Sequence, residues 1–115
     1  MSKKLMIVLA VLIVFSGSPA HAATLDSHSD VIRARGTDTY SMTLEGGRSY
    51  QITVDGDGDT DLDAFLYDEN GNLVAKDDDE TDYCVLRVRP RWSGPFELRI
   101  RNLGRVANLY TLTLE

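Results

Sequence analysis

Two clusters of carboxylates lie on either side of one short apolar segment, residues 62–67. The first cluster alternates aspartate with glycine and threonine, and the second is an almost unbroken acidic run. Calcium takes about six to eight oxygen ligands, which carboxylates supply well, whereas like charges crowded together without a cation repel one another. The clusters therefore predict a calcium site, with solvated acidic loops as the alternative. The candidate ligands are Asp57, Asp59, Asp61, Asp77, Asp78, Asp79 and Asp82.

The spacing of the first cluster bears on how such a site would form. The aspartates at odd positions from 57 to 63 share a parity, so on an extended strand they face the same side. Gly56 and Gly58 would let the first two carboxylates fold back toward the second cluster. The cluster is not an EF-hand loop, because Leu62 occupies the sixth position counted from Asp57, where that loop needs glycine.

Four arginines share a parity on two runs that a short turn joins. In a hairpin they would lie on one outward face, close enough to repel unless something opposes them. One interpretation is pairing with acids of the same sheet face, namely Asp61, Asp63 or Glu97. The other is a patch that binds an anionic partner protein or acidic glycan, for which bidentate arginine contacts are suited. The arginines are Arg87, Arg89, Arg99 and Arg101.

Two aromatic residues and one cysteine also stand out by their parity. Phe65 and Tyr67 alternate with the apolar residues of their run, so they are predicted to face away from the core. They would form a binding platform for a sugar or peptide, or be covered by a loop or by the second sheet. Cys84 shares the parity of Leu86 and Val88, which favours a buried thiol over an intermolecular disulfide.

Catalytic residues are not indicated. Beyond residue 22 the sequence has a single histidine, His28, and it lacks a nucleophile motif and a set of zinc ligands. The acidic residues are crowded onto turns rather than placed across a cleft as a glycosidase pair would be. We therefore expect a protein that is not an enzyme.

The N-terminus has the three parts of a secretory signal peptide. Lys3 and Lys4 are followed by the apolar run 5–15 and by the small-x-small sequence that ends at Ala22. The apolar run is too short to span a bilayer, which needs about 20 residues. We expect cleavage after Ala22, no membrane span after cleavage, and a secreted or periplasmic protein.

Composition narrows the partners further. The chain has 18 acidic and 12 basic residues and a net charge of −6, which becomes more negative when the leader is removed. This charge disfavours nucleic acid and anionic membranes as partners. The 115 residues fit one domain, expected as a monomer, and a single cysteine permits no internal disulfide. A structural metal would compensate for a small core.

The dominant pattern beyond residue 30 is the alternation of apolar and polar residues in short runs between turn residues, with no convincing helix. Such a pattern predicts an all-β fold, an antiparallel β-sandwich of about seven or eight strands. Residues 23–30 are polar and are expected to be flexible, which leaves 31–115 as the folded domain. The predicted strands lie near 31–35, 40–44, 50–54, 62–67, 73–75, 84–88, 96–100 and 110–114.

These residues resemble a known family. The run from Tyr50 to Asp63, with its Gly-Asp-Gly-Asp-Thr-Asp-Leu-Asp sequence, is followed by Tyr67-Asp68-x-Asn70-Gly71 and by the Asp77–Asp79 turn. Together with Gly94-x-Phe96 and Ile100-x-Asn102-x-Gly104, these motifs resemble the bacterial pre-peptidase C-terminal domain. The resemblance implies a jelly-roll-like sandwich over about residues 31–115. It also implies a place beside a secreted protease, and related domains of clostridial collagenases bind calcium and collagen.

The chain carries no protease, so we expect a free-standing module. The predicted function is that of an exported, calcium-binding module that binds an extracellular or periplasmic protein or polysaccharide without catalysis. The alternative is an accessory or secretion-assisting domain that acts on a separately encoded secreted protease. A third interpretation is a stable exported scaffold that binds no metal.

Overall fold

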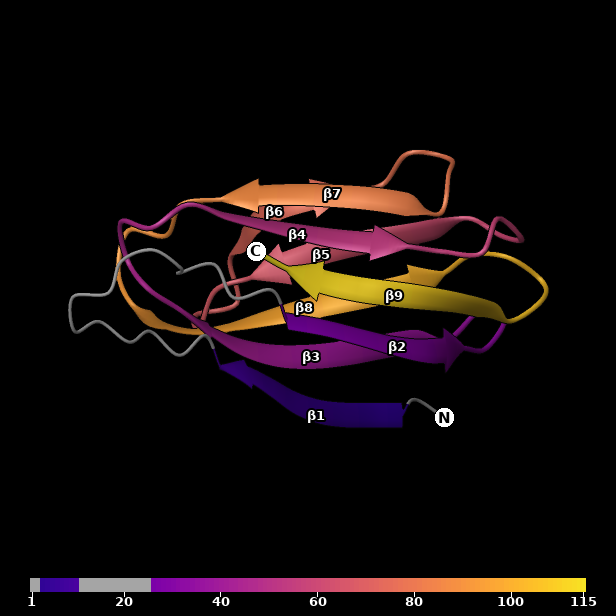
Figure 1. Cartoon of the computed structure of the whole chain (residues 1–115), viewed down its shortest axis with the longest axis horizontal. Helices are drawn as coiled ribbons and strands as arrows, with labels where there is room; N and C mark the ends of the chain where they lie inside the picture. Colours follow the sequence, from indigo (N-terminus) through magenta and orange to yellow (C-terminus); the bar gives the residue numbers. More distant parts are fainter. Residues whose placement is uncertain (1–2, 11–25) are drawn as a thin grey trace.

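The computed structural model describes residues 3–10 and 26–115, which form two β-sheets packed face to face (Figure 1). Sheet A has the strand order β1-β3-β8-β5-β6, and sheet B has the order β2-β9-β4-β7. The described residues contain no helix. The strands are β1 (Lys3–Ala10), β2 (Asp26–Ile32), β3 (Thr37–Leu44), β4 (Tyr50–Asp55), β5 (Leu62–Tyr67), β6 (Leu73–Asp77), β7 (Tyr83–Val88), β8 (Gly94–Asn102) and β9 (Asn108–Leu114).

Strands β2 to β9 pair only in antiparallel fashion with one another. The chain changes sheets repeatedly, so that β3 pairs with β8 and β2 pairs with β9 although these strands are far apart in sequence. Eight antiparallel strands in two sheets confirm the predicted β-sandwich. The alternation of the sequence explains the arrangement, because each strand presents every second residue to the other sheet.

The core lies between the two sheets. Tyr40 and Leu98 of sheet A and Ile52 and Leu112 of sheet B have no exposed surface, and the residues between them in each strand face outward. Cys84 belongs to the same core and is a free, fully buried cysteine. The predicted burial of this thiol is therefore confirmed. Packing of these side chains is the main source of stability in a fold without a disulfide.

Several buried polar side chains in this core have hydrogen-bond partners. The hydroxyl of Tyr110 donates a 2.7 Å hydrogen bond to Asp38 and also bonds with the hydroxyl of Tyr40. Asn102 donates from its amide nitrogen to the carbonyls of Ile32 and Val106. Such bonds offset the cost of removing polar groups from water.

The N-terminal part differs from the sequence prediction. Residues 26–30 were expected to be flexible, but β2 begins at Asp26 and pairs along its whole length with β9. The hydroxyls of Ser29 and Thr111 bond across this pair at 2.9 Å. An edge strand of this kind is stabilised by its ladder rather than by an apolar face, so it has little periodic pattern in its sequence.

Strand β1 falls within the predicted signal peptide and pairs with β3 in parallel. The predicted cleavage sequence around Ala22 lies outside the described residues. The signal peptide and its cleavage therefore remain predictions. The described part of the chain has no helix of the length and hydrophobicity needed to cross a bilayer.

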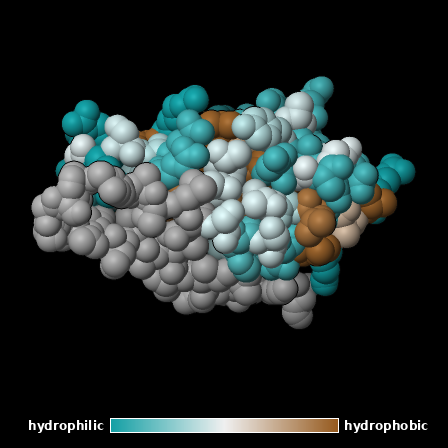
Figure 2. Space-filling view, viewed as in Figure 1, coloured by the Kyte–Doolittle hydropathy of each residue, from teal (hydrophilic) through white to brown (hydrophobic). Residues whose placement is uncertain are grey.

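Apolar surface is exposed where β2 ends and β9 begins. Val31 and Leu109 are cross-strand partners there, and each is 52% exposed. Figure 2 shows hydrophobic residues gathered at this right-hand end of the molecule, with mostly polar residues over the rest of the visible coloured face.

Candidate functional site

Of the predicted calcium ligands, five carboxylates accept hydrogen bonds from nearby groups. Asp57 accepts from the backbone nitrogens of Asp59 and Leu109, at 3.1 and 3.0 Å. Asp82 accepts from the nitrogen of Gly58 at 2.6 Å and from the side-chain amide of Asn108 at 3.0 Å. The turn at Gly56 and Gly58 therefore brings the two clusters together through Asp82. Asp57 was predicted to face the second cluster, but its carboxylate instead accepts a hydrogen bond from Leu109 in β9.

The second cluster is organised in the same way. Asp77 accepts a 2.9 Å hydrogen bond from the backbone nitrogen of Val85, and Asp79 accepts from the nitrogen and hydroxyl of Thr81, both at 3.0 Å. Asp78 forms an exposed ion pair with Lys76 at 3.3 Å. These bonds hold the loop between β6 and β7.

The backbone hydrogen bonds to Asp57 in the first cluster lower the pKa of its carboxyl, because they favour the charged form.

Asp61 and Asp63 are different, because each has one buried carboxylate oxygen without a hydrogen-bond partner among the described residues. Burial, followed by the charge of Asp61, raises the pKa of Asp63 to about 6. The pKa of Asp61 is also raised, first by burial and then by the charges of Asp79, Glu80 and Asp82. Two carboxylates are therefore held in an unfavourable state that a bound cation would relieve.

Asp63 was not among the predicted metal ligands, although it shares the parity of Asp61. The sequence suggested an arginine partner for it, and Arg101 does lie opposite Asp63 in the pairing of β5 with β8. Within the residues that the structure describes, no three histidine, cysteine, aspartate or glutamate side chains converge closely enough to hold a metal. The donor types at Asp61 and Asp63 fit calcium, while a complete set of protein ligands is not assembled around them.

The four candidate arginines do not share a face. Arg87 belongs to β7, the last strand of sheet B, whereas Arg99 and Arg101 belong to β8 in the middle of sheet A. The predicted hairpin is therefore wrong, because residues 89–93 carry the chain from one sheet to the other. The alternation of residues along the sequence cannot distinguish a hairpin within one sheet from a crossover between two sheets.

Arg99 of sheet A has partners on its own face. Arg99 forms a 2.9 Å ion pair with Glu97, and its guanidinium carbon lies 4.5 Å from the centroid of the Tyr67 ring. Phe65 lies directly opposite Arg99 in the pairing of β5 with β8. Phe65 and Tyr67 are half-buried and point outward as predicted. The charge of Arg99 is therefore matched by a neighbour on the same sheet face.

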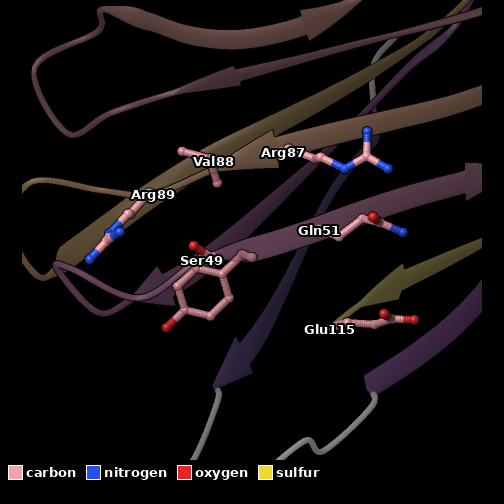
Figure 3. A pocket seen from close by; sticks show the side chains of 7 residues that line it. Ser49, Gln51, Arg87, Val88, Arg89 and Glu115 are labelled. Carbon is pink, nitrogen blue, oxygen red and sulfur yellow. The ribbon is translucent and has the colours of Figure 1, made fainter.

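The arginines at the end of β7 have no ion-pair partners among the described residues. Arg87 is exposed and has no ion-pair or hydrogen-bond partner within the described residues, and Arg89 donates from Nε to the carbonyl of Gly47 at 3.1 Å. A hollow of about 500 Å³ lies on one side of this strand end. Figure 3 shows Arg87, Gln51 and Glu115 extending from neighbouring strands along this hollow, while Arg89 points the other way.

A second hollow, of about 460 Å³, lies on the other side of the same strand end. It adds Arg91 and Trp92, neither of which the sequence indicated as a ligand-binding residue. The only sequence sign was the cluster of alternating arginines that continues from Arg87 through Arg91 into the turn. Arg87 and Arg89 therefore come together with a different set of neighbours than predicted.

Comparisons with known proteins bear on this arrangement. Residues 36–86 match the sequence model of the bacterial pre-peptidase C-terminal domain. The fold is similar to the crystal structure of the pre-peptidase C-terminal domain of a collagenase from Bacillus anthracis, with a TM-score of 0.63 and 16% identity, over 100% of this chain and 97% of that chain. The resemblance to the pre-peptidase C-terminal domain is confirmed.

Two further solved structures are similar to this chain in fold. One is PliG of Aeromonas hydrophila, a periplasmic inhibitor of g-type lysozyme, with a TM-score of 0.61 and 10% identity over 98% of both chains. The other is PliG of Salmonella Typhimurium, with a TM-score of 0.53 and 16% identity over 100% of this chain and 98% of that chain. No curated protein matches the sequence. At these identities the likeness concerns the fold alone.

The matched segment includes all the predicted calcium ligands together with Phe65 and Tyr67. It ends at residue 86, one residue before Arg87. The arginine-rich strand end and Trp92 therefore lie outside the matched segment.

Proposed function

We propose that the protein is an exported, non-catalytic module that binds an anionic protein or polysaccharide outside the cytoplasm. The observation that carries the proposal is the unpaired Arg87 beside Arg89 and Arg91, at a strand end with a hollow on each side. The chain has an excess of acidic residues, and Arg87 forms no ion pair with any of those that the structure describes. Guanidinium groups bind carboxylates and other oxyanions through paired hydrogen bonds.

Export is proposed on the N-terminal pattern of residues 1–22. Absence of catalysis is proposed because the described side chains do not form a catalytic pair around the remaining histidine. His28 packs edge-on against Tyr40, with 5.8 Å between ring centroids, and its Nε2 has no hydrogen-bond partner among the described residues. A binding role needs only a presented surface.

Calcium is proposed as a structural ion. Asp61 and Asp63 would hold it through their unpartnered buried oxygens, and Asp78 and Asp79 are the nearby acids whose charges raise the pKa of Asp63. The bound ion would supply positive charge where β5 begins, and so connect that strand to the β6–β7 loop. A ligand that binds only the folded state at about 1,000 times its dissociation constant adds roughly 4 kcal/mol to stability.

The binding proposal is tested with two polyanions, poly-glutamate and alginate, titrated into the purified protein by calorimetry. We expect at least one to bind, and we expect an Arg87→Ala/Arg89→Ala double variant to lose that binding. The matched control is Arg99→Ala/Arg101→Ala, which removes the same charge from sheet A and should retain most of the affinity. Equal losses in the two variants would overturn the proposal, and so would failure of every anionic probe, polymer or peptide, to bind.

The calcium proposal is tested separately by thermal unfolding with calcium, with magnesium and with excess EDTA. We expect calcium alone to raise the midpoint by several degrees, and an Asp61→Asn/Asp63→Asn variant to show the same midpoint in all three solutions. Unchanged curves for the unmodified protein would mean that the aspartates are solvated charge.

A further inference from the structure

The second hollow at the end of β7 has the makeup of a peptide-binding groove. It lies between Val74 of β6 and Val88 of β7, and Phe96 and Trp92 complete its apolar lining. Phe96 is only 5% exposed and belongs to the core, whereas Val74 and Trp92 are 41% and 46% exposed. A groove of about 460 Å³ with such a lining is large enough for a few apolar side chains.

The rim of this groove is cationic. Arg87, Arg89 and Arg91 are all exposed and all line it. The one carboxylate that lines the groove, Asp68, is buried and accepts hydrogen bonds from the backbone nitrogens of Asn70 and Asn72. Its negative charge is therefore stabilised by its own turn rather than by the arginines. Those bonds also lower the pKa of Asp68. The groove therefore has a net positive rim in a protein of negative overall charge.

The backbone beside the groove is an open strand edge. β7 is the last strand of sheet B, and the nitrogen of Val85 donates to the Asp77 carboxylate rather than to another strand. In an antiparallel strand, every second residue points its N–H and C=O toward the same edge. Arg87 therefore points its backbone N–H and C=O toward the same edge as Val85, beyond the point that Asp77 covers.

The segment that carries Arg91 and Trp92 is held in place by the turn between β3 and β4. Gly46 donates to the hydroxyl of Ser93 at 2.9 Å, and Gly47 donates to the carbonyl of Pro90 at 2.7 Å. A groove with a fixed wall loses little entropy when a ligand enters it.

We propose that an extended acidic peptide of a partner protein adds to the edge of β7 at Arg87–Arg89. Side chains alternate along a strand, so one set would meet the arginines on the outer side, and the other set would enter the groove beside Val88 and Trp92. A segment in which acidic and apolar residues alternate fits both sets. The inference rests on the proposed function and names its partner chemistry. Strand addition supplies backbone hydrogen bonds that a polysaccharide would not form.

Trp92 is the only tryptophan of the chain, so its fluorescence reports on the groove directly. The probe is a capped hexapeptide in which glutamate alternates with valine, titrated into the purified protein. We expect the emission of Trp92 to shift to shorter wavelength and its quenching by acrylamide to decrease. The Arg87→Ala/Arg91→Ala variant should weaken binding roughly tenfold or more. The charge-matched control, Arg101→Ala/Arg105→Ala, removes two exposed arginines that do not line the groove and should bind normally.

Backbone pairing is tested with two N-methylated versions of the peptide. One carries methyl groups on the glutamate nitrogens and the other on the valine nitrogens, so each blocks one edge of the extended peptide. Only one edge can pair with β7, and we therefore expect one version to lose binding and the other to keep it. Equal binding of the two versions would overturn strand addition.

The remaining outcomes separate this inference from the proposed function. If alginate shifts the Trp92 emission in an arginine-dependent way and the peptide does not, the peptide inference is wrong while the binding function stands. If neither polyanions nor peptide bind, the proposed function fails as well. A lysine-for-glutamate version of the peptide that binds equally would refute the role of charge.

Discussion

The Sγ atom of Cys84 lies 3.2 Å from the carbonyl oxygen of Leu62, so a hydrogen bond joins β7 of sheet B to β5 of sheet A across the core. Burial, and then the charge of Asp77, raises the pKa of this thiol to about 12. A thiol is reactive as the thiolate, and this one is both protonated and inaccessible at neutral pH.

We therefore expect Cys84 to react with iodoacetamide only when the protein unfolds. Mass spectrometry should show an unmodified native protein after prolonged exposure at neutral pH, and complete modification in guanidinium chloride. A native protein that is alkylated rapidly, or that forms a disulfide-linked dimer, would contradict the buried position.

Asp57 and Asp59 were equivalent in the sequence prediction, and the structure separates them. Both side chains are exposed, but the Asp57 carboxylate accepts hydrogen bonds from the backbone nitrogens of Leu109 and Asp59. We expect Asp57→Ala to lower the unfolding midpoint in EDTA, because it frees two backbone donors. Asp59→Ala is the matched control and should leave the midpoint nearly unchanged. Equal midpoints for the two variants in EDTA would show that Asp57 has no structural role of its own.

The raised pKa of Asp63 makes the stability of the folded protein depend on pH. Its folded pKa of about 6 lies above its ordinary value of 3.8, so the folded protein binds this proton more tightly than the unfolded chain does. In EDTA, the contribution of Asp63 to stability is highest at low pH and decreases as pH rises from about 4 to 6. Chemical denaturation across this range should show the decrease, and Asp63→Asn should remove its part. A contribution that increases with pH in this window would contradict the raised pKa.

The side chain of Asn102 joins several backbone segments at one end of the sandwich. It is fully buried, donates to the carbonyls of Ile32, Arg33 and Val106, and accepts from the nitrogen of Gly104. We expect Asn102→Ala to lower the free energy of unfolding by roughly 2–4 kcal/mol, because several buried groups lose their partner. Urea denaturation measures the change. Asn70→Ala, at an exposed turn position, is the control and should cost far less.

Much of this fold could be predicted because its strands obey a simple rule of alternation. The runs around Tyr40, Ile52 and Leu98 showed which residues enter the core, and the structure buries them. β2 was largely missed because its polar sequence pairs through the backbone alone. Pairing between distant strands, such as β3 with β8, leaves no local pattern in a single sequence.

The candidate site was predicted less completely for a related reason. The aspartates were identified by type and spacing, but which of them accept backbone hydrogen bonds depends on contacts with residues as distant as Leu109. The arginines were assigned to one face because parity does not reveal which sheet a strand joins. Trp92 and Arg91 entered the site only when the crossover from β7 to β8 placed them beside β6.

The turn between β3 and β4 offers a last test of how the groove is held. A Cβ atom on Gly46 would lie 2.6 Å from the backbone Cα of Trp92, closer than real contacts allow. Gly46→Ala must therefore displace the Pro90–Ser93 segment, which Gly46 and Gly47 bind. We expect the variant to be less stable and to show a red-shifted emission of Trp92 in the native state.

Gly58→Ala is the matched control for this substitution. Gly58 has a positive φ of 90° and no heavy atom within 4 Å of an added Cβ, so alanine there adds backbone strain without a collision. It lies in the loop between β4 and β5, away from the Pro90–Ser93 segment in sequence and in pairing. The control should lower stability while leaving the native Trp92 emission unchanged. If both variants shift the emission equally, the change reflects general loosening of the fold rather than displacement of the groove wall.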